Sequence, residues 1–189
     1  NHRVKNTLAT VQALASQTVR HARDPAQFLE AFSSRLQALG QAHGMLSENE
    51  WRGVALRELV RLEVLPFDDK ESRIRISGSD IFLTPDQVLG LGLVLHELAS
   101  NALKFGALSV SAGTVDLDWT VQGSGKDRKL AMTWKETGGP RVEPPAHQGF
   151  GSILIRRSLA KVIASEVSHE FRPEGVYAAI SLPLEASSV

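Results

Sequence analysis

The stretch His-Glu-Leu-Ala-Ser-Asn-Ala-Leu-Lys-Phe at residues 96–105 decides what fold and what chemistry this chain is expected to have. Its periodicity predicts a helix on which Glu97, Asn101 and Lys104 occupy one polar stripe at i, i+4 and i+7. A carboxylate, an amide oxygen and an ammonium group in one column are the groups that a magnesium–triphosphate site needs. A separate apolar stripe of the same helix comprises Leu91, Leu95, Leu98, Ala102 and Phe105.

The polar stripe also has a plainer interpretation. Glu and Lys side chains on one helix face often form solvated ion pairs that contribute little to stability. On spacing alone this interpretation is favoured. The functional interpretation therefore depends on other segments of the chain.

Composition excludes several classes of function. The 189 residues suit one large domain or two small ones, and 21 basic residues balance 21 acidic ones, which predicts no binding of nucleic acid or anionic membrane. Cysteine is absent, so disulfides and thiolate chemistry are excluded. The chain shows no signal peptide and no membrane-spanning apolar run. We expect a cytoplasmic protein. Because Asn1 enters a helical pattern directly, we also expect a fragment of a longer protein whose sensor domain lies upstream.

Two amphipathic helices are expected in residues 1–50. Asp24 and Pro25 suit the N-cap and first position of the second helix, so a short turn joins the two into an antiparallel αα-hairpin. Each narrow apolar seam is expected to pack against a second copy of the hairpin, giving a homodimer, or against another domain. The seams comprise Val4, Leu8, Val11, Ala15 and Thr18 in the first helix and Phe28, Phe32, Leu36, Leu39, His43 and Leu46 in the second.

Residues 51–189 alternate between helical and strand patterns, which predicts an α+β fold: the helical hairpin followed by an α/β sandwich. Its sheet is expected to be mixed, mostly antiparallel and covered by helices on one face. The expected strands are 73–76, 81–83, 115–121, 129–135, 166–171 and 176–182, with 73–76 and 81–83 forming a strand, turn and strand. The expected helices are 55–65, a long one capped by Thr84 and Pro85, and 152–164.

His2 is a candidate phosphate acceptor. A rotation of about 100° per residue places it roughly opposite Val4, away from the seam. An exposed imidazole is a neutral nucleophile near neutral pH. A plain surface histidine is the alternative, which spacing alone favours. The histidines His21, His43, His147 and His169 show no metal-like spacing and are expected to be structural or surface residues, and Trp51 and Trp119 to be packing residues.

Two glycine-containing segments are candidates for nucleotide binding. A strand is expected to end at Glu136, where a buried carboxylate could accept a hydrogen bond from an adenine amino group, and Gly138 and Gly139 would let the backbone approach the base. The alternative is an ordinary turn at a strand end. Gly149 and Gly151 precede a helix and could offer backbone N–H groups to phosphates, although a lone Gly-x-Gly is a weak signal.

Together and in this order, these segments resemble the HWE family of histidine kinases, named after a histidine in the N-box and a Trp-x-Glu in the first glycine box. The histidine corresponds to His96 and the Trp-x-Glu to Trp134-Lys135-Glu136. The resemblance implies that the H-box is residues 2–6 with His2 as the acceptor. It also implies an N-box at residues 96–104 that places Asn101 on magnesium. The glycines of the two boxes are Gly138 and Gly139, then Gly149 and Gly151.

The resemblance implies a dimerisation and phosphotransfer hairpin at residues 1–50 and an ATP-binding domain of the gyrase, Hsp90 and histidine-kinase type at residues 51–189. The cofactors would be ATP and Mg²⁺, and phosphate would pass from ATP to His2 and then to an aspartate of a response-regulator receiver. Glu97 would assist proton handling and Lys104 would steady the phosphates. Glu136 would face the adenine, Gly138, Gly149 and Gly151 would contact the nucleotide, and the stretch from Thr137 to Gly149 would be the ATP lid.

The sequence departs from ordinary histidine kinases at two positions. Arg3 stands where an acidic residue usually follows the acceptor, and Glu136 takes the place of the aspartate of Asp-x-Gly-x-Gly. Two other functions remain open from the residues. One is a non-catalytic phosphotransfer or docking scaffold of the same fold. The other is a serine kinase or anti-sigma factor on the same ATP fold, which the exposed His2 disfavours.

Overall fold

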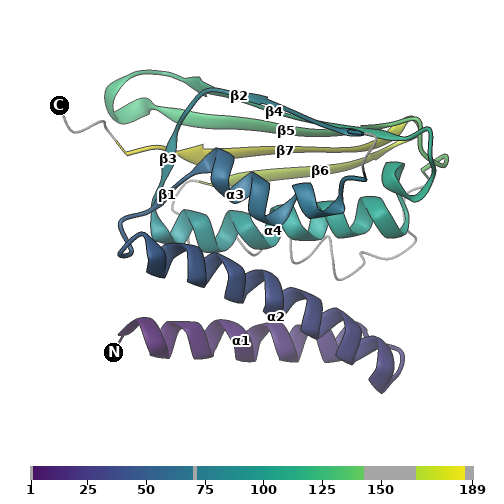
Figure 1. Ribbon diagram of the computed structural model, residues 1–189, viewed down its shortest axis with the longest axis horizontal. Coiled ribbons are helices and arrows are strands. Elements are labelled where there is room, and N and C mark those ends of the chain that lie inside the picture. The colour runs from purple at the N-terminus through teal and green to yellow at the C-terminus, as the bar shows by residue number, and fades with distance from the viewer. Residues whose placement is uncertain (1, 70–71, 143–164, 186–189) are drawn as a thin grey trace.

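The structure, a computed structural model, describes residues 2–69, 72–142 and 165–185. An antiparallel hairpin of α1 (His2–His21) and α2 (Pro25–Glu48) lies below a layer of helices, and a β-sheet covers that layer from above (Figure 1). The hairpin turn forms as the sequence predicts, because Pro25 begins α2 and the Asp24 carboxylate accepts a hydrogen bond from the Gln27 backbone N–H at 2.8 Å. The predicted helical hairpin is confirmed.

The apolar seam expected in α1 is covered only toward the C-terminal end of the helix. Its packing against a second copy stays a prediction. Leu14 and Thr18 are buried, whereas Val4 and Leu8 are 57% and 62% exposed. Residues four apart lie on one side of a helix, and the side that carries Leu14 and Thr18 is the one that meets the rest of the protein. Leu14 forms a small core cluster with Ala38, Leu39 and Leu93, the last from the long helix that the sequence predicts after Thr84.

Five strands form one mixed sheet in the described residues, in the order β2-β4-β5-β7-β6. The pair β2·β4 is parallel, and the pairs β4·β5, β5·β7 and β6·β7 are antiparallel. The predicted mixed, mostly antiparallel sheet is thus confirmed. The bounds of these strands are β2 Ile74–Gly78, β4 Thr114–Gln122, β5 Lys129–Thr137, β6 Glu166–Arg172 and β7 Gly175–Pro183.

The predicted strand–turn–strand of residues 73–76 and 81–83 is wrong as a pairing, although both strands exist. β2 joins the main sheet beside β4, whereas β3 (Phe82–Leu83) pairs with β1 (Val54–Ala55) in a separate two-stranded sheet. A short polar link between two strands suggests that they pair with each other. The sequence does not reveal the actual pairing, because the partner of each strand lies far away along the chain. β2 finds its partner only after the chain has passed through α4.

Helices α3 (Leu56–Glu63) and α4 (Pro85–Lys104) cover one face of the sheet, as predicted (Figure 1). Burial alternates along β4 and β5, and the buried side chains of these strands meet the apolar stripe of α4. Thr84 and Gln87 form a capping box that starts α4. Phe105, expected on the apolar stripe, is instead 75% exposed just beyond the helix end. Short 3₁₀ helices span Leu65–Phe67, Ala107–Ser109 and Gly125–Asp127.

The hairpin packs on the helix layer through α2, which lies along α4. Consequently α1 forms the outer layer, with its N-terminus at one end of the molecule and the α1–α2 turn at the other (Figure 1). In the described part of the chain, no helix has the length and apolarity that crossing a bilayer requires. The predicted helix 152–164, Gly149, Gly151 and most of the expected lid lie outside the described residues.

Candidate nucleotide site

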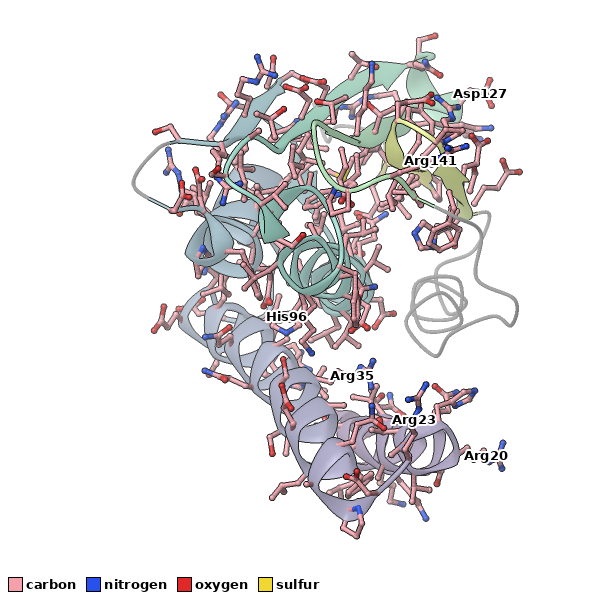
Figure 2. All side chains as sticks on the ribbon, turned by 90° about the vertical axis from the view of Figure 1, so that its right-hand side faces the viewer. Arg20, Arg23, Arg35, His96, Asp127 and Arg141 are labelled. Carbon is pink, nitrogen blue, oxygen red and sulfur yellow. The ribbon has the colours of Figure 1, made fainter. Side chains whose placement is uncertain are left out.

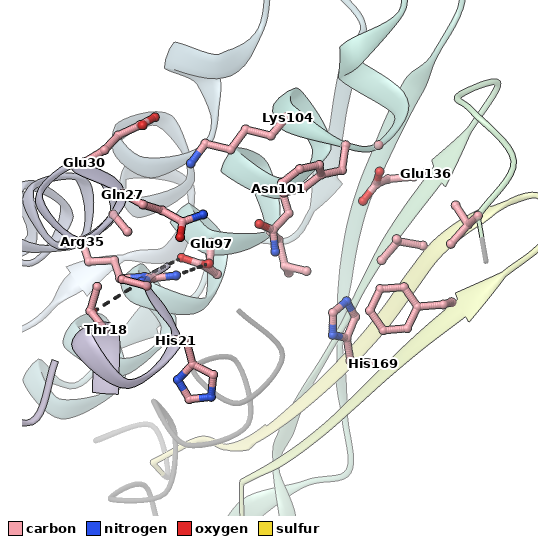
Figure 3. A pocket seen from close by; sticks show the side chains of 18 of the residues that line it. Thr18, His21, Gln27, Glu30, Arg35, Glu97, Asn101, Lys104, Glu136 and His169 are labelled. Carbon is pink, nitrogen blue, oxygen red and sulfur yellow. Dashed lines mark hydrogen bonds and ion pairs between the residues drawn. The ribbon is translucent and has the colours of Figure 1, made fainter. Parts of the chain in front are cut away.

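A cavity of about 800 Å³ lies between the α1–α2 turn and the C-terminal end of α4, a size typical of ligand pockets. The predicted residues Glu97, Asn101, Lys104 and Glu136 all line it (Figure 3). The first three come from successive turns of α4, and the fourth from the end of β5. The hairpin contributes the opposite wall, with the residues Thr18, His21, Ala22, Arg23, Gln27, Glu30, Ala31 and Arg35.

Glu136 is held in place by its own part of the fold. Its Oε1 accepts a hydrogen bond from the Ala107 backbone N–H at 3.0 Å, and its Oε2 accepts one from Trp134 Nε1–H at 2.9 Å. The residue is 3% exposed, and burial raises the pKa of its carboxyl while the two N–H donors act in the opposite direction. A carboxylate has about four acceptor sites, so two remain for a ligand amino group.

The turn that follows β5 packs tightly against the segment after α4. The predicted approach of this backbone to a nucleotide base stays a prediction. Gly138 has a φ of +74°, which favours glycine. A Cβ on Gly139 would lie 2.6 Å from the Ala107 Cα, and a Cβ on Gly106 would clash with the Glu136 Oε1. Glycine at these positions therefore allows the Glu136 carboxylate to sit where it does. The exposure of Gly138 keeps the turn open to solvent.

Glu97 is held differently, by a residue of the hairpin. Arg35 donates from Nη2 to Glu97 Oε1 at 2.8 Å and from Nε to Glu97 Oε2 at 3.2 Å (Figure 3). The two side chains are only 10% and 7% exposed. This two-point geometry is the strong form of an arginine–carboxylate contact. Arg35 also donates from Nη1 to Thr18 Oγ1 at 3.5 Å, which ties the pair to α1.

Asn101 and Lys104 complete the α4 side of the cavity. Asn101 is half-buried with its amide in the cavity, and Lys104 is exposed at the rim (Figure 3). Among the described residues no group of three His, Asp or Glu side chains gathers as a metal site would require.

His2 lies far from this cavity. It is exposed, as predicted, and begins α1, whereas the cavity adjoins His21 at the other end of the same helix. At 1.5 Å per residue the separation along α1 is roughly 28 Å. The structure thus brings the four α4 and β5 residues together and leaves the expected acceptor outside. His21 and His169, which we expected to be plain structural or surface residues, line the cavity instead.

Comparison with known proteins agrees with this geometry. Residues 1–80 match the model of the HWE histidine kinase family. The blue-light-activated histidine kinase of Brucella anthropi is 40% identical over 187 residues, which make up 98% of this chain and 38% of that protein. The protein of the same name from Brucella abortus is 36% identical over 97% of this chain, again 38% of its own length. This chain belongs to the HWE histidine kinase family.

Solved structures support the same fold. The Erythrobacter litoralis EL346 blue-light activated histidine kinase aligns with a TM-score of 0.68 and 17% identity, over 97% of this chain and 59% of that one. Its separate histidine kinase domain aligns with a TM-score of 0.63 and 16% identity, over 93% and 96% of the two chains. The chain spans 38% of the length of these curated relatives and 59% of the longer solved structure.

The three residues after which the HWE family is named lie in two places in this chain. Trp134 and Glu136 are partners in one hydrogen bond at the cavity. His96 lies beside the cavity, where its Nε2 is 2.9 Å from Ser34 Oγ of α2. Burial lowers the pKa of His96, and Phe67 packs against its ring edge. The predicted packing role of Trp119 is confirmed, because it is buried and donates to the Ser79 carbonyl.

Sequence reasoning missed the hairpin wall of the site, above all Arg35. One signal was present: Arg35 falls between Phe32 and Leu39 on the apolar stripe of α2, where a charged side chain needs a buried partner. The partner itself could not be found, because Glu97 is 62 residues away along the chain. His169 and Phe171 on β6 line the far side of the cavity and carried no spacing signal.

Proposed function

We propose that this chain autophosphorylates His2 from Mg-ATP and passes the phosphoryl group to an aspartate of a response-regulator receiver domain. The observation that carries the proposal is the cavity with a fixed, buried Glu136 at one end and Glu97, Asn101 and Lys104 at the other. The first suits the adenine amino group and the second suits a charged triphosphate. ATP as the donor is consistent with a cytoplasmic location.

Each residue has a role that its chemistry supports. Glu136 accepts from the adenine amino group, and Gly138 lets the backbone approach the base. Asn101 places its amide oxygen on the metal ion, and Lys104 offsets phosphate charge. Glu97 receives the proton that the acceptor imidazole loses as it attacks the γ-phosphorus and ADP leaves. Gly149 and Gly151 contact the phosphates through their N–H groups. Catalysis is then mainly positioning and charge neutralisation, as in phosphoryl transfer generally.

The distance between His2 and the cavity requires movement. We divide the chain into residues 1–50 and residues 51–189, and the second unit must change its place on the first, or serve the His2 of another copy. The N-terminal half of α1 carries Val4 and Leu8, both more than half exposed, which suits a homodimer through the hairpin. For transfer to His2 of the same chain, the arrangement in which α2 is docked on α4 must therefore open.

The test compares two histidines of one helix. His2→Ala should abolish labelling by γ-labelled ATP and leave ATP binding intact, because His2 is far from the cavity. His21→Ala is the matched control, since His21 is exposed on the same helix and lines the cavity. Labelling that persists in His2→Ala and disappears in His21→Ala would show that the acceptor is His21.

The non-catalytic scaffold is the other candidate, and nucleotide binding separates the two. A kinase core should bind ATP more tightly with Mg²⁺ than without it, because Asn101 can contact the metal only when the metal is present. Isothermal titration with and without Mg²⁺ measures this. Absence of ATP binding under both conditions would favour the scaffold, in which Glu136 and Glu97 serve the fold alone.

A further inference from the structure

Four side chains join the hairpin to the nucleotide-binding helix at the edge of the cavity. The consecutive residues Ser34 and Arg35 of α2 meet the consecutive residues His96 and Glu97 of α4. We call these four residues the α2–α4 latch. Figure 2 shows Arg35 and His96 at the junction between the hairpin below and the helix layer above. Ser34 contacts His96, and the next residue, Arg35, contacts the next residue, Glu97. Two adjacent contacts of this kind fix the position of one helix along the other.

The latch is polar and largely withdrawn from water. Arg35 and Glu97 are 8% and 5% exposed as residues, and His96 is only partly exposed. Removing one member of a buried ion pair leaves the other charge uncompensated, which is costly. A shift of α2 along α4 by even one turn would break both contacts together. The hairpin and the helix layer therefore either dock in this position or separate.

His96 is arranged to hold the hairpin. Its Nδ1 faces Glu63 Oε2 at 3.6 Å, which is too long for a hydrogen bond. Both Glu63 carboxyl oxygens are without a hydrogen-bond partner among the described residues, and burial raises the pKa of this carboxyl to about 8. Glu63 is thus mostly a neutral acid at neutral pH. The neutral imidazole between Glu63 and Phe67 hydrogen-bonds to Ser34 on the hairpin.

The docked arrangement is incompatible with phosphorylation of His2. Both oxygens of Glu97 are bonded to Arg35, so an incoming imidazole would meet a carboxylate that is already paired with a cation. His2 is roughly 28 Å away along α1. Both obstacles are removed by one event, the separation of α2 from α4. A side chain that stabilises the contact between α2 and α4 therefore also controls the rate of the kinase reaction.

We propose that His96 is a positioning residue: through Ser34 it sets Arg35 against Glu97 and holds the kinase in a resting arrangement until the α2–α4 latch opens. The proposal rests on the kinase function proposed above. It gives the histidine of the HWE signature a role that does not involve contact with ATP. It also assigns Arg35 to the resting state, so Arg35 should be dispensable for the transfer itself.

The kinetic test uses adjacent serines. Ser34→Ala removes the partner of His96, and Ser33→Ala changes an exposed neighbour on the same helix. Loss of one hydrogen bond should shift the docking equilibrium, and hence kcat for autophosphorylation of His2, upward by about fivefold. Ser33→Ala should change nothing. KM for ATP should stay the same in both variants, because neither serine lines the cavity.

A double-mutant cycle tests whether His96 acts through Ser34. His96→Phe keeps an aromatic ring and removes both nitrogens, so alone it should raise kcat as Ser34→Ala does. The variant with both substitutions should be no faster than either single variant, because the two act through one contact. A decrease of kcat in His96→Phe with Ser34→Ala unchanged would overturn the positioning role and place His96 in the transfer chemistry.

A distance measurement separates this proposal from the kinase function. The chain contains no cysteine, so cysteines introduced at the exposed positions Gln37 and Lys126 carry spin labels on α2 and on the β4–β5 turn alone. The native chain should give one narrow distance, Ser33→Ala the same one, and Arg35→Gln a broad distribution at longer distance. Unchanged distances in Arg35→Gln and Ser34→Ala would overturn the latch. If the distances shift in Arg35→Gln but the native chain has no kinase activity, the latch is supported and only the proposed function is contradicted.

Discussion

Two buried carboxylates of the cavity, Glu136 and Glu97, are held in opposite ways. Glu136 receives both of its hydrogen bonds from residues that follow the hairpin, namely Trp134 and the Ala107 backbone. Glu97 receives both of its hydrogen bonds from Arg35, a residue of the hairpin. One carboxylate therefore keeps its position whether or not the hairpin is docked, and the other depends on docking.

The difference divides the site into two functional halves. At the end proposed for adenine, the carboxylate is held in place without the hairpin, so on the proposed function nucleotide recognition needs no rearrangement there. The end that suits phosphates contains a carboxylate whose partner changes with the position of the hairpin. A protein built this way can bind ATP in its resting state and still delay transfer. The following predictions test this division, starting from the largest expected effect.

Glu136→Gln should weaken ATP binding strongly, and Glu97→Gln should not. The amide introduced by the first substitution turns an N–H₂ group toward one of the two N–H donors that now face Glu136, and the charge that strengthens a bond to adenine is lost. A hydrogen bond to a charged group is worth about 1.5–3 kcal/mol, so Kd should rise by about 10- to 100-fold. Calorimetric titration of both variants measures this. Equal losses in the two variants would remove the distinction between the halves.

Glu63 provides a pH-dependent test of the junction itself. The pKa of about 8 in the folded protein exceeds the ordinary value of 4.5, so the folded state retains a proton that the unfolded chain releases between these values. The contribution of this group to the free energy of unfolding is complete below about pH 4.5 and is lost as pH rises through 8, by at most about 1.4 kcal/mol per pH unit.

The matched variants are Glu63→Gln and Glu48→Gln, the second at an exposed position on α2. Denaturant unfolding between about pH 5 and pH 8 should show the falling stability in the native chain and in Glu48→Gln, and a flatter profile in Glu63→Gln. Identical profiles in all three proteins would mean that Glu63 is ionised throughout this range.

Trp134→Phe should have the smallest effect. It removes one donor from Glu136 and leaves the Ala107 N–H in place. Loss of a hydrogen bond worth about 1 kcal/mol predicts a roughly fivefold rise in Kd for ATP. Trp119→Phe is the control, because Trp119 is also buried and also donates from Nε1, but to Ser79 outside the cavity. Both variants should lose stability, and only the first should lose affinity.

Local signals in the sequence predicted much of this architecture, and long-range contacts explain what they missed. The caps at Asp24 and Thr84 use residues three apart, so their geometry can be deduced from the chain itself. The polar stripe of α4 and the strand end at Glu136 are likewise local patterns, and they converge in one cavity. The parallel pairing of β2 with β4 and the Arg35–Glu97 contact join distant segments, for which spacing along the chain holds no information.

The capping box at Thr84 fixes the direction of α4, and this has an electrostatic consequence. The helix starts far from the cavity and ends beside it, at Lys104. The aligned peptide dipoles of a helix leave about half a negative charge at its C-terminal end. A triphosphate placed there meets a repulsive field from the backbone in addition to the charge of Glu97. Cations therefore have to restore the balance at this end, and Lys104, in the last turn of the helix, is one that the chain itself provides, together with Arg23 and Arg141 of the cavity wall.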